Sequence, residues 1–423
     1  MKNGSTAAKL LQSGIIFSAI SFLTGLGNLA FQSVMGNHLT EAGQYGNTNS
    51  ALNTFMPLLG LIPSIAVFAV THYIAHYNSI GDTAGLHGLL AGCRKFLFRL
   101  TLFGSLLAIA LAKPLGTLFQ FSTSLMIVTL VFTLLGLWTS LATALCQGLA
   151  WFKRLALIAF LAMVLKVALG YGITLKWPRP EMFVVAAIFS LTAYLILLFW
   201  RRDLATPAQT PVTSPWNREF IDFLVVSAAL VVGNYCFSLS DLLVMQCNFP
   251  RTAGSDAYTA AERLGFALPS TVGPLLTVLF TNRSAARTSD AFRAQMKLIA
   301  LYAAGLVFGA VCLCLLRHLC LKILHKDSPE AAEMIRPLAV TMVFVGLLQA
   351  MGTWALASRW RKIALLYGAL GLAYTILNLM VGTTSAALLH AMPLAAGTAF
   401  VILFAVWFIA LRRHQPVASS PSP

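Results

Sequence analysis

Two ionisable side chains, Lys166 and Asp241, interrupt stretches of the sequence that are otherwise apolar for about twenty residues. A charge inside a stretch apolar enough to span a membrane is costly unless it faces a cavity or a partner. Lys166 can therefore present a cation to an anionic group in a central cavity, or it can be held by backbone carbonyls between helices. Asp241 can bind a coupling proton or cation, or it can form an ion pair with Arg251 or Arg263.

Uncharged polar side chains occupy related places in two apolar segments. Asn28 and Gln32 are one helical turn apart in the first segment, and Asn234 lies in the seventh. One interpretation is that all three line the cavity that Lys166 faces, where they would bind a substrate. The other is that they form hydrogen bonds between helices.

A charged pair and four prolines are candidates for gating and bending. Glu262 and Arg263 precede the eighth apolar segment at its predicted outer end, where they form a gate or simply favour a helix end. Proline removes a backbone donor and bends a helix, so prolines in corresponding helices predict bending during alternating access. These prolines are Pro57 and Pro63 in the second segment and Pro269 and Pro274 in the eighth.

Motifs for common catalytic and nucleotide-binding chemistry are absent. The sequence has no GxxxxGK[ST], HExxH, GxSxG or DxD pattern. His72 and His76 are one turn apart, but neither a third ligand nor an acidic neighbour accompanies them. We therefore expect no metal, no cofactor, no ATP binding and no enzymatic activity. A gradient would then supply the energy of transport.

The elements that must hold these residues are membrane-spanning helices. Of the 423 residues, 58% are hydrophobic and only 10% are charged, whereas a soluble domain carries about a quarter charged residues. A helix needs roughly 20 apolar residues to cross a bilayer, so we predict an all-α polytopic membrane protein with about twelve such helices. The apolar runs place them at residues 10–35, 50–76, 96–112, 122–146, 155–175, 182–200, 220–246, 264–281, 296–316, 335–357, 362–384 and 391–411.

The excess of basic residues indicates an orientation in the membrane rather than a nucleic-acid partner. The net charge is +16, but Lys and Arg lie in short gaps between apolar runs. If the N-terminus is cytoplasmic, every even-numbered loop is basic, as the positive-inside rule requires. We predict a multi-pass protein of the cell inner membrane, with both termini in the cytoplasm and membrane lipids as partners.

Several short motifs of the first half recur in the second half, at an offset of about 210 residues. Gly27-Asn28 in the first helix recurs as Gly233-Asn234 in the seventh. Ordered agreement of this kind predicts two parallel six-helix repeats with a substrate site at their interface. The predicted parts are a first bundle at 1–202, a cytoplasmic linker at 203–217, a second bundle at 218–413 and a disordered cytoplasmic tail at 414–423.

Three short motifs carry a resemblance to a known family. They are EAGQYG at 41–46, DLLV at 241–244 and YTAAERL at 258–264. Together with the topology, they resemble the polysaccharide-unit flippases of the multidrug/oligosaccharidyl-lipid/polysaccharide (MOP) exporter superfamily. The resemblance implies a MATE-like fold in which two six-helix bundles enclose a V-shaped central cavity. It also implies that an undecaprenyl-pyrophosphate-linked glycan passes to the outer leaflet, with other polysaccharide-assembly proteins as partners.

Alternative functions stay open beside this one. The related peptidoglycan-precursor flippases cluster Arg in the cavity, and the first two predicted helices here contain none. A multidrug or cation antiporter of the same superfamily would use membrane carboxylates, for which Asp241 is the candidate. A membrane enzyme of glycan assembly would need a large outer loop, and the longest candidate, 317–336, is short. The leading prediction is a flippase that moves a lipid-linked oligosaccharide by alternating access.

Overall fold

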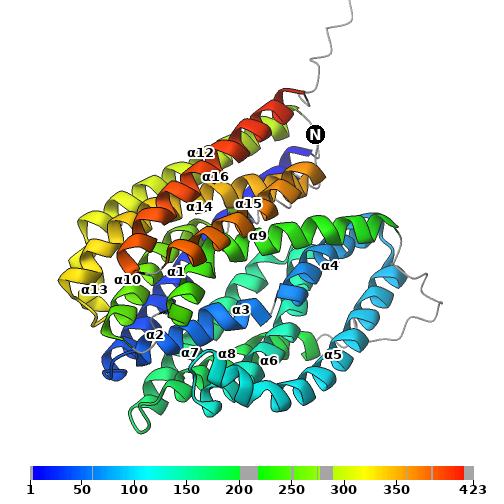
Figure 1. The fold of residues 1–423 in the computed structure, drawn as a ribbon. Coiled ribbons are helices and arrows are strands. Elements are labelled where there is room, and N and C mark those ends of the chain that lie inside the picture. The colour runs from blue at the N-terminus through cyan, green and yellow to red at the C-terminus, as the bar shows by residue number, and fades with distance from the viewer. Residues whose placement is uncertain are drawn as a thin grey trace, which may run out of the picture.

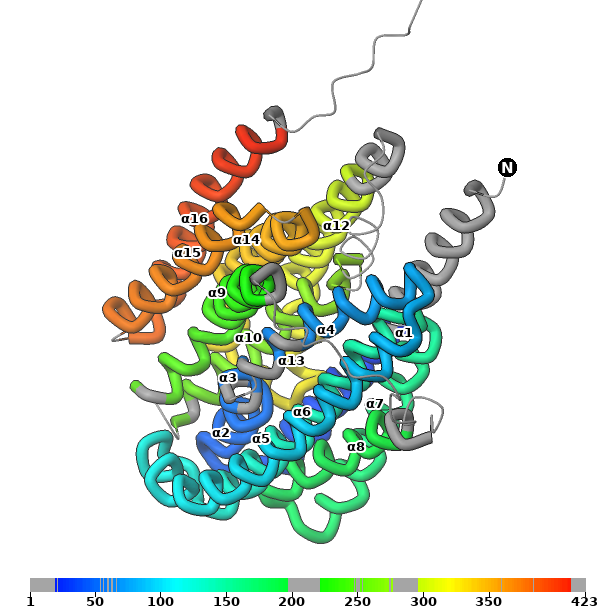
Figure 2. The backbone as a smooth tube through the Cα atoms, turned by 90° about the vertical axis from the view of Figure 1, so that its right-hand side faces the viewer, coloured from blue at the N-terminus to red at the C-terminus, as the bar shows by residue number. Residues whose placement is uncertain are grey.

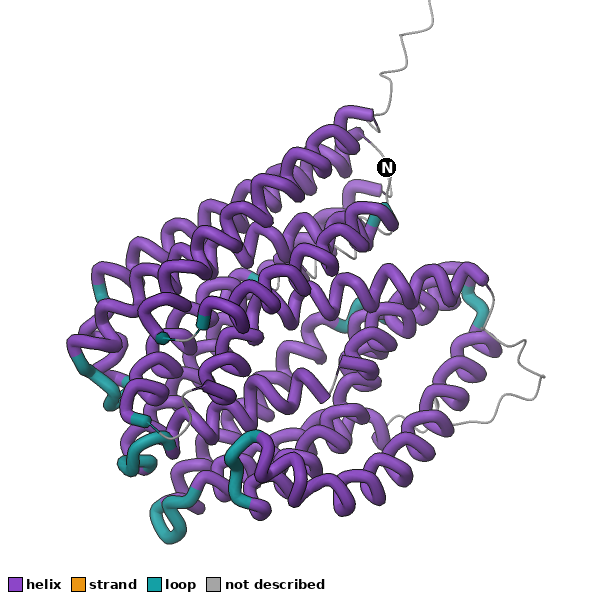
Figure 3. Tube along the Cα trace, viewed as in Figure 1, coloured by secondary structure: helices purple, strands orange, loops and turns teal. Residues whose placement is uncertain are grey.

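The computed structural model describes a protein that is helical throughout its described residues (Figure 3). These residues are 3–59, 61–200, 218–248, 252–273, 275–276, 289–358, 360–382 and 384–413. The predicted linker at 203–217 and the predicted tail at 414–423 lie outside them.

The first half begins with a long helix and continues with a series of four helical segments, one of which is a π-helical turn. The helices are α1 (Asn3–His38), the broken series α2 (Gln44–Ser50), η1 (Ala51–Phe55), α3 (Met56–Leu59) and α4 (Leu61–Ile80), and then α5 (Thr83–Leu118), α6 (Thr123–Gly148), α7 (Phe152–Thr174) and α8 (Pro180–Trp200).

The second half repeats this order with one short extra helix, α13, between its third and fourth long helices. Its helices are α9 (Arg218–Asn248), α10 (Ala253–Val272), α12 (Ser289–Leu315), α13 (Arg317–Ile323), α14 (Pro329–Ala357), α15 (Arg361–Val381) and α16 (Ser385–Arg413).

The predicted fold class is confirmed. Each predicted span coincides with a helix or, for the second span, with the series α2 to α4. Among the described residues, eight helices are long and apolar enough to cross a membrane. The positions of the termini agree with an even number of crossings, because α1 begins and α16 ends at the same end of the molecule (Figures 1 and 2). Which side of the membrane that end faces stays a prediction.

Several helices begin earlier than predicted, α5 at Thr83 rather than at residue 96 most of all. Local chemistry explains the differences in the second and eighth spans. The second span is not one α-helix from residue 50 to 76, because a π-helical turn (η1) interrupts it directly before Met56 and Pro57. The eighth span starts at Ala253 rather than at residue 264. The side chain of Thr252 accepts a hydrogen bond from the backbone N–H of Ser255 and so begins the helix there.

The two halves pack in the same order, as a parallel repeat requires. In the first half α1 packs on α7, α4 on α6, α5 on α6, α6 on α8 and α7 on α8. In the second half the corresponding contacts are α9 on α15, α10 on α14, α12 on α14, α14 on α16 and α15 on α16. Figure 1 shows α12–α16 gathered on one side of the molecule and α5–α8 on the other. The repeat read from short motifs is therefore a repeat of packing.

Small residues allow a close contact between α9 and α15. A Cβ placed on Gly371 would lie only 2.9 Å from the Cα of Gly233. Membrane helices commonly use glycine for such close approach. The packing holds Asn234, the residue after Gly233, against α15.

Candidate functional site

A cavity inside the first half brings together three of the predicted substrate-binding residues. The cavity has a volume of about 210 Å³, and α1, η1, α6, α7 and α8 enclose it. We call it the N-half cavity. Its polar lining consists of Thr24, Asn28, Gln32, Asn53, Lys166 and Ser190, with Tyr194 at the same wall.

Lys166 is the only charged residue among the described residues that line the N-half cavity. Its Nζ donates a hydrogen bond to Oδ1 of Asn28 at 2.5 Å and lies 4.7 Å from the centre of the Phe31 ring. An amide oxygen and a ring face stabilise a cation, but neither neutralises its charge. The cavity can therefore accommodate an anionic group beside Lys166.

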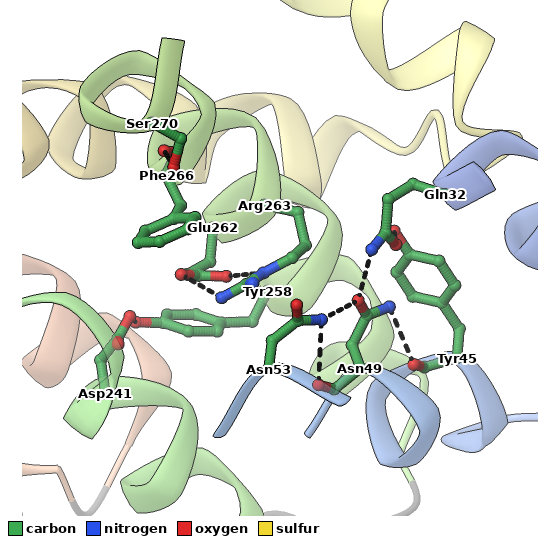
Figure 4. Close-up of polar contacts among 10 residues, drawn as sticks. All are labelled: Gln32, Tyr45, Asn49, Asn53, Asp241, Tyr258, Glu262, Arg263, Phe266 and Ser270. Atoms are coloured by element: carbon green, nitrogen blue, oxygen red, sulfur yellow. Dashed lines mark hydrogen bonds and ion pairs between the residues drawn. The ribbon is translucent and has the colours of Figure 1, made fainter. Parts of the chain in front are cut away.

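Gln32 connects the N-half cavity to the helix that follows. Its Nε2 donates to Oδ1 of Asn49 at 2.8 Å, and its Oε1 accepts from the Tyr45 hydroxyl at 2.9 Å (Figure 4). Asn53, which also lines the cavity, donates to Oδ1 of Asn49 at 3.1 Å. This chain of polar groups ties the cavity wall to α2.

Asn234 lies elsewhere, contrary to the expectation that it would share a cavity with Asn28. Its Oδ1 accepts from the Tyr367 hydroxyl of α15 at 2.5 Å. The reason is the repeat itself: Asn28 faces Lys166 on the fifth helix of its own half, and Asn234 faces the fifth helix of the other half. Equivalent positions in a parallel repeat are therefore separated in space.

Asn234 instead lines a second cavity, which lies between the two halves. This inter-half cavity has a volume of about 400 Å³. Segments α3 and α4 form its wall from the first half, and α9, α10 and α14 form the wall from the second half. Its described lining includes Pro57, Ser64, Phe68, Asn234, Ser238 and Gln349.

Asp241 is buried inside the second half, with one carboxylate oxygen unused. The side chain is 1% exposed, and Oδ2 accepts from the Tyr258 hydroxyl at 2.8 Å (Figure 4). In the described part of the chain, Oδ1 of Asp241 has no hydrogen-bond partner, and neither do the Tyr374 hydroxyl and the Asn378 side chain of α15. Arg251, one of its two predicted ion-pair partners, lies outside the described residues.

The other predicted partner, Arg263, pairs with its neighbour Glu262. Nε of Arg263 lies 2.5 Å from Oε2 of Glu262, and Nη2 lies 2.7 Å from Oε1. Arg263 also lies over the ring of Phe266, 5.0 Å from its centre. Because α10 begins at Ala253, this pair is buried within the helix rather than placed at its outer end.

The contact that holds the halves together at the end opposite the termini, which the predicted orientation places outside, involves Asp256, which the sequence did not single out. Its two carboxylate oxygens accept from the backbone N–H groups of Gly46 at 2.7 Å and Gly43 at 3.0 Å. Lys326 adds a second contact, because its Nζ donates to the carbonyl of Leu39 at 3.0 Å. We call these contacts of Asp256 and Lys326 the outer latch.

An acidic residue in the first turn of a helix is a recognisable sequence signal, and Asp256 occupies that place in α10. Its partners are 210 and 213 residues away in the chain. Sequence reasoning could therefore have marked the carboxylate but not its contacts.

One of the four prolines, Pro57, lines a cavity. Pro57 lines the inter-half cavity beside the break between η1 and α4. Pro269 is buried inside α10. Pro63 lies within α4, and Pro274 lies outside the described residues. Bending at these prolines stays a prediction.

No protein-family model matches the chain. No curated protein matches it either.

Solved structures of similar fold do match, over nearly the whole chain. An inward-facing multidrug-resistance MATE family transporter of the MOP superfamily has 14% identity and a TM-score of 0.68, and the match covers 95% of this chain and 100% of that one. The outward-facing conformation of such a transporter has 13% identity and a TM-score of 0.70, covering 95% and 96%.

A third structure is a MOP superfamily transporter from Pyrococcus furiosus, for which a reversed polarity of the binding pocket is reported to suggest a different function. It has 12% identity and a TM-score of 0.71, and the match covers 96% of each chain. The protein therefore has the fold of MOP superfamily transporters, MATE proteins among them. Identities this low establish the fold alone.

Proposed function

We propose that this protein is a secondary transporter that works by alternating access and that its cargo is a lipid-linked oligosaccharide, the repeat unit of a polysaccharide. The observation that carries the proposal is the unneutralised cation of Lys166 in the N-half cavity. The pyrophosphate of such a lipid is an anion, and a partly buried cation binds an anion more strongly than a fully exposed one because less solvent competes. Structures of this fold in inward-facing and outward-facing conformations support the transport mechanism.

The proposed coupling site is Asp241. A gradient is the proposed energy source, because the sequence has no P-loop. A coupling proton or cation would find the free Oδ1 of Asp241 together with the oxygens of Tyr374 and Asn378, all three buried without partners in the described structure. An intramembrane carboxylate of this kind is a usual place for a coupling ion.

A multidrug or cation antiporter is the alternative, and it fits the cavities less well. A cationic drug would be stabilised by a carboxylate, yet no described residue that lines either cavity is acidic. A membrane enzyme of glycan assembly fits less well again. The segment proposed for its outer loop folds as α13 and the beginning of α14.

The test uses Lys166→Gln in bacterial cells that lack the chromosomal gene. We expect lipid-linked glycan to accumulate on the inner leaflet and surface polysaccharide to fall about tenfold, the factor that 1.4 kcal/mol of lost binding produces. Lys166→Arg keeps the charge and should restore much of the transport. Lys176→Gln, at an exposed lysine beside Trp177, is the matched control.

Normal surface polysaccharide in the Lys166→Gln strain, at wild-type protein abundance, would contradict the proposal. Resistance to cationic dyes that depends on the protein would favour the antiporter instead.

A further inference from the structure

We propose that the cargo is shared between the two cavities, with its pyrophosphate in the N-half cavity and an uncharged sugar in the inter-half cavity. The inference rests on the proposed function and adds to it the chemical class of the glycan. It follows from the size of the two cavities, from their different linings and from the wall between them.

The N-half cavity is too small for the whole head group. Sites that enclose drug-sized ligands have volumes of about 300–1,000 Å³. The N-half cavity, at about 210 Å³, lies below that range, and the inter-half cavity, at about 400 Å³, lies within it. The glycan therefore needs a place outside the cavity that holds Lys166.

The inter-half cavity has the lining of a site for a neutral, hydroxylated ligand. Its polar groups are amides and hydroxyls, and the rings of Phe68, Tyr235 and Phe266 form part of its wall. None of its described lining residues carries a charge. A uronate or a charged amino sugar would be buried here without a counter-ion, which costs far more than the burial of a hydroxyl group.

The amides of this cavity keep hydrogen-bonding groups for a ligand. Nε2 of Gln349 donates to the Ser238 hydroxyl at 2.7 Å, and Oδ1 of Asn234 accepts from Tyr367 at 2.5 Å. These two bonds use one donor of Gln349 and the acceptor of Asn234. Each amide retains N–H groups, and Gln349 retains its carbonyl oxygen, which suits sugar hydroxyls that both donate and accept.

The charged pair next to this cavity does not make it cationic. Phe266 lines the cavity, and Arg263 lies against that ring. One edge of the Arg263 guanidinium, formed by Nε and Nη2, pairs with both carboxylate oxygens of Glu262. The Glu262–Arg263 pair is neutral overall. No net charge therefore lies behind the Phe266 ring that lines the cavity.

A single broken segment separates the two cavities. Leu52 and Asn53 of η1 line the N-half cavity, whereas Pro57 of α3 and Leu61 of α4 line the inter-half cavity. Residues four apart in a helix are separated by about 6 Å along its axis. A sugar bonded directly to a pyrophosphate can thus reach both cavities past one helical turn.

The experiment measures binding to the purified full-length protein in nanodiscs with three probes. They are undecaprenyl pyrophosphate, the same lipid carrying a neutral disaccharide, and the same lipid carrying a disaccharide that contains a uronic acid. We expect the neutral glycolipid to bind about tenfold more tightly than the uronate glycolipid, a difference of 1.4 kcal/mol.

Substitutions assign each part of the cargo to a cavity. Lys166→Gln should weaken binding of all three probes. Gln349→Leu should lower the affinity for the neutral glycolipid to that for undecaprenyl pyrophosphate and leave the latter unchanged. Thr353→Val, a nearly isosteric change in the same lining, provides a second variant if Gln349→Leu does not fold. Lys176→Gln is again the control.

The possible failures are distinguishable. Equal affinities of the wild-type protein for the neutral and uronate glycolipids would overturn this inference while leaving the role of Lys166 intact. Unchanged binding of undecaprenyl pyrophosphate by a folded Lys166→Gln variant would contradict the proposed function itself.

Discussion

Lys166 and Tyr374 occupy corresponding positions in the two halves, counted from the matched basic segments that begin α7 and α15. Each lies near a phenylalanine of the first helix of its half. The centre of the Phe31 ring is 4.7 Å from Nζ of Lys166, and the Phe237 ring centre is 5.3 Å from that of Tyr374. One half thus places a cation where the other places a phenol. With the proposed function, this duplicated position would contribute to the cargo site in one half and to the coupling site in the other.

The coupling role proposed for Asp241 makes the first prediction at this scale. Asp241→Asn keeps the shape of the side chain and removes its charge. In proteoliposomes, the rate of transport driven by an imposed sodium or proton gradient should be about tenfold lower for the variant. A loss of 1.4 kcal/mol in ion binding corresponds to that factor. Binding of undecaprenyl pyrophosphate should stay unchanged.

Asp222→Asn is the matched control, because Asp222 is half exposed and pairs with Arg361 at a distance of 3.1 Å. A gradient dependence that is identical in wild type and Asp241→Asn would rule out Asp241 as the coupling residue.

The sequence predicted the surroundings of some single residues better than those of others. Lys166 and Asp241 were recognisable because a charged side chain in a long apolar run is costly unless it has a partner or faces a cavity. Asn234 does not line the cavity that Lys166 faces, because equivalence between repeats does not mean proximity, and its hydrogen bond with Tyr367 fits the other interpretation of this residue. Tyr374 and Asn378 were missed, since neither carries a charge and their significance depends on the free oxygen of Asp241, far away in the sequence.

Among the elements, the broken series α2, η1, α3 and α4 contributes the wall between the N-half cavity and the inter-half cavity. Apolar runs were enough to predict the helices, because a bilayer tolerates few other structures. The prolines of the second span indicated an interruption, but not the π-helical turn that precedes Pro57. Asn53 of this turn donates to Asn49, and Asn49 accepts from Gln32 of α1, a tertiary contact that left no local signal.

Pro57→Ala should make the broken series more stable and the transporter less active. Alanine restores a backbone donor, and proline in a helix interior costs about 3 kcal/mol relative to alanine. Part of that energy should appear as a higher unfolding midpoint. Transport should fall several-fold, because the wall between the two cavities becomes stiffer.

Pro114→Ala in α5 is the matched control, since Pro114 also lies inside a helix but lines neither cavity. Wild-type transport by a stabilised Pro57→Ala variant would show that the break has no role in the cycle.

In the whole molecule, the two halves are joined at the end opposite the termini. Besides the outer latch, the Ser33 hydroxyl donates to the carbonyl of Ile323 at 2.6 Å, and Gln246 donates to Asn47 at 3.0 Å. At the other end the halves meet through the stacked rings of His72 and Phe223. With the termini in the cytoplasm, as predicted, the outer end is the hydrogen-bonded one. Exposure of the cargo to the outer leaflet would then require these bonds to break.

Asp256→Ala should open the outer latch. The substitution removes two charge-assisted hydrogen bonds to the backbone N–H groups of Gly43 and Gly46, and such bonds are each worth about 1.5–3 kcal/mol. Hydrogen–deuterium exchange of the peptide covering residues 39–50 should therefore accelerate at least about tenfold. Peptides of α9 and α15 should exchange as in wild type. Asp327→Ala, at a partly exposed carboxylate near Lys326, controls for loss of a negative charge at this end. If exchange of residues 39–50 is unchanged in Asp256→Ala, the remaining contacts of Ser33, Gln246 and Lys326 are sufficient to keep the outer end closed.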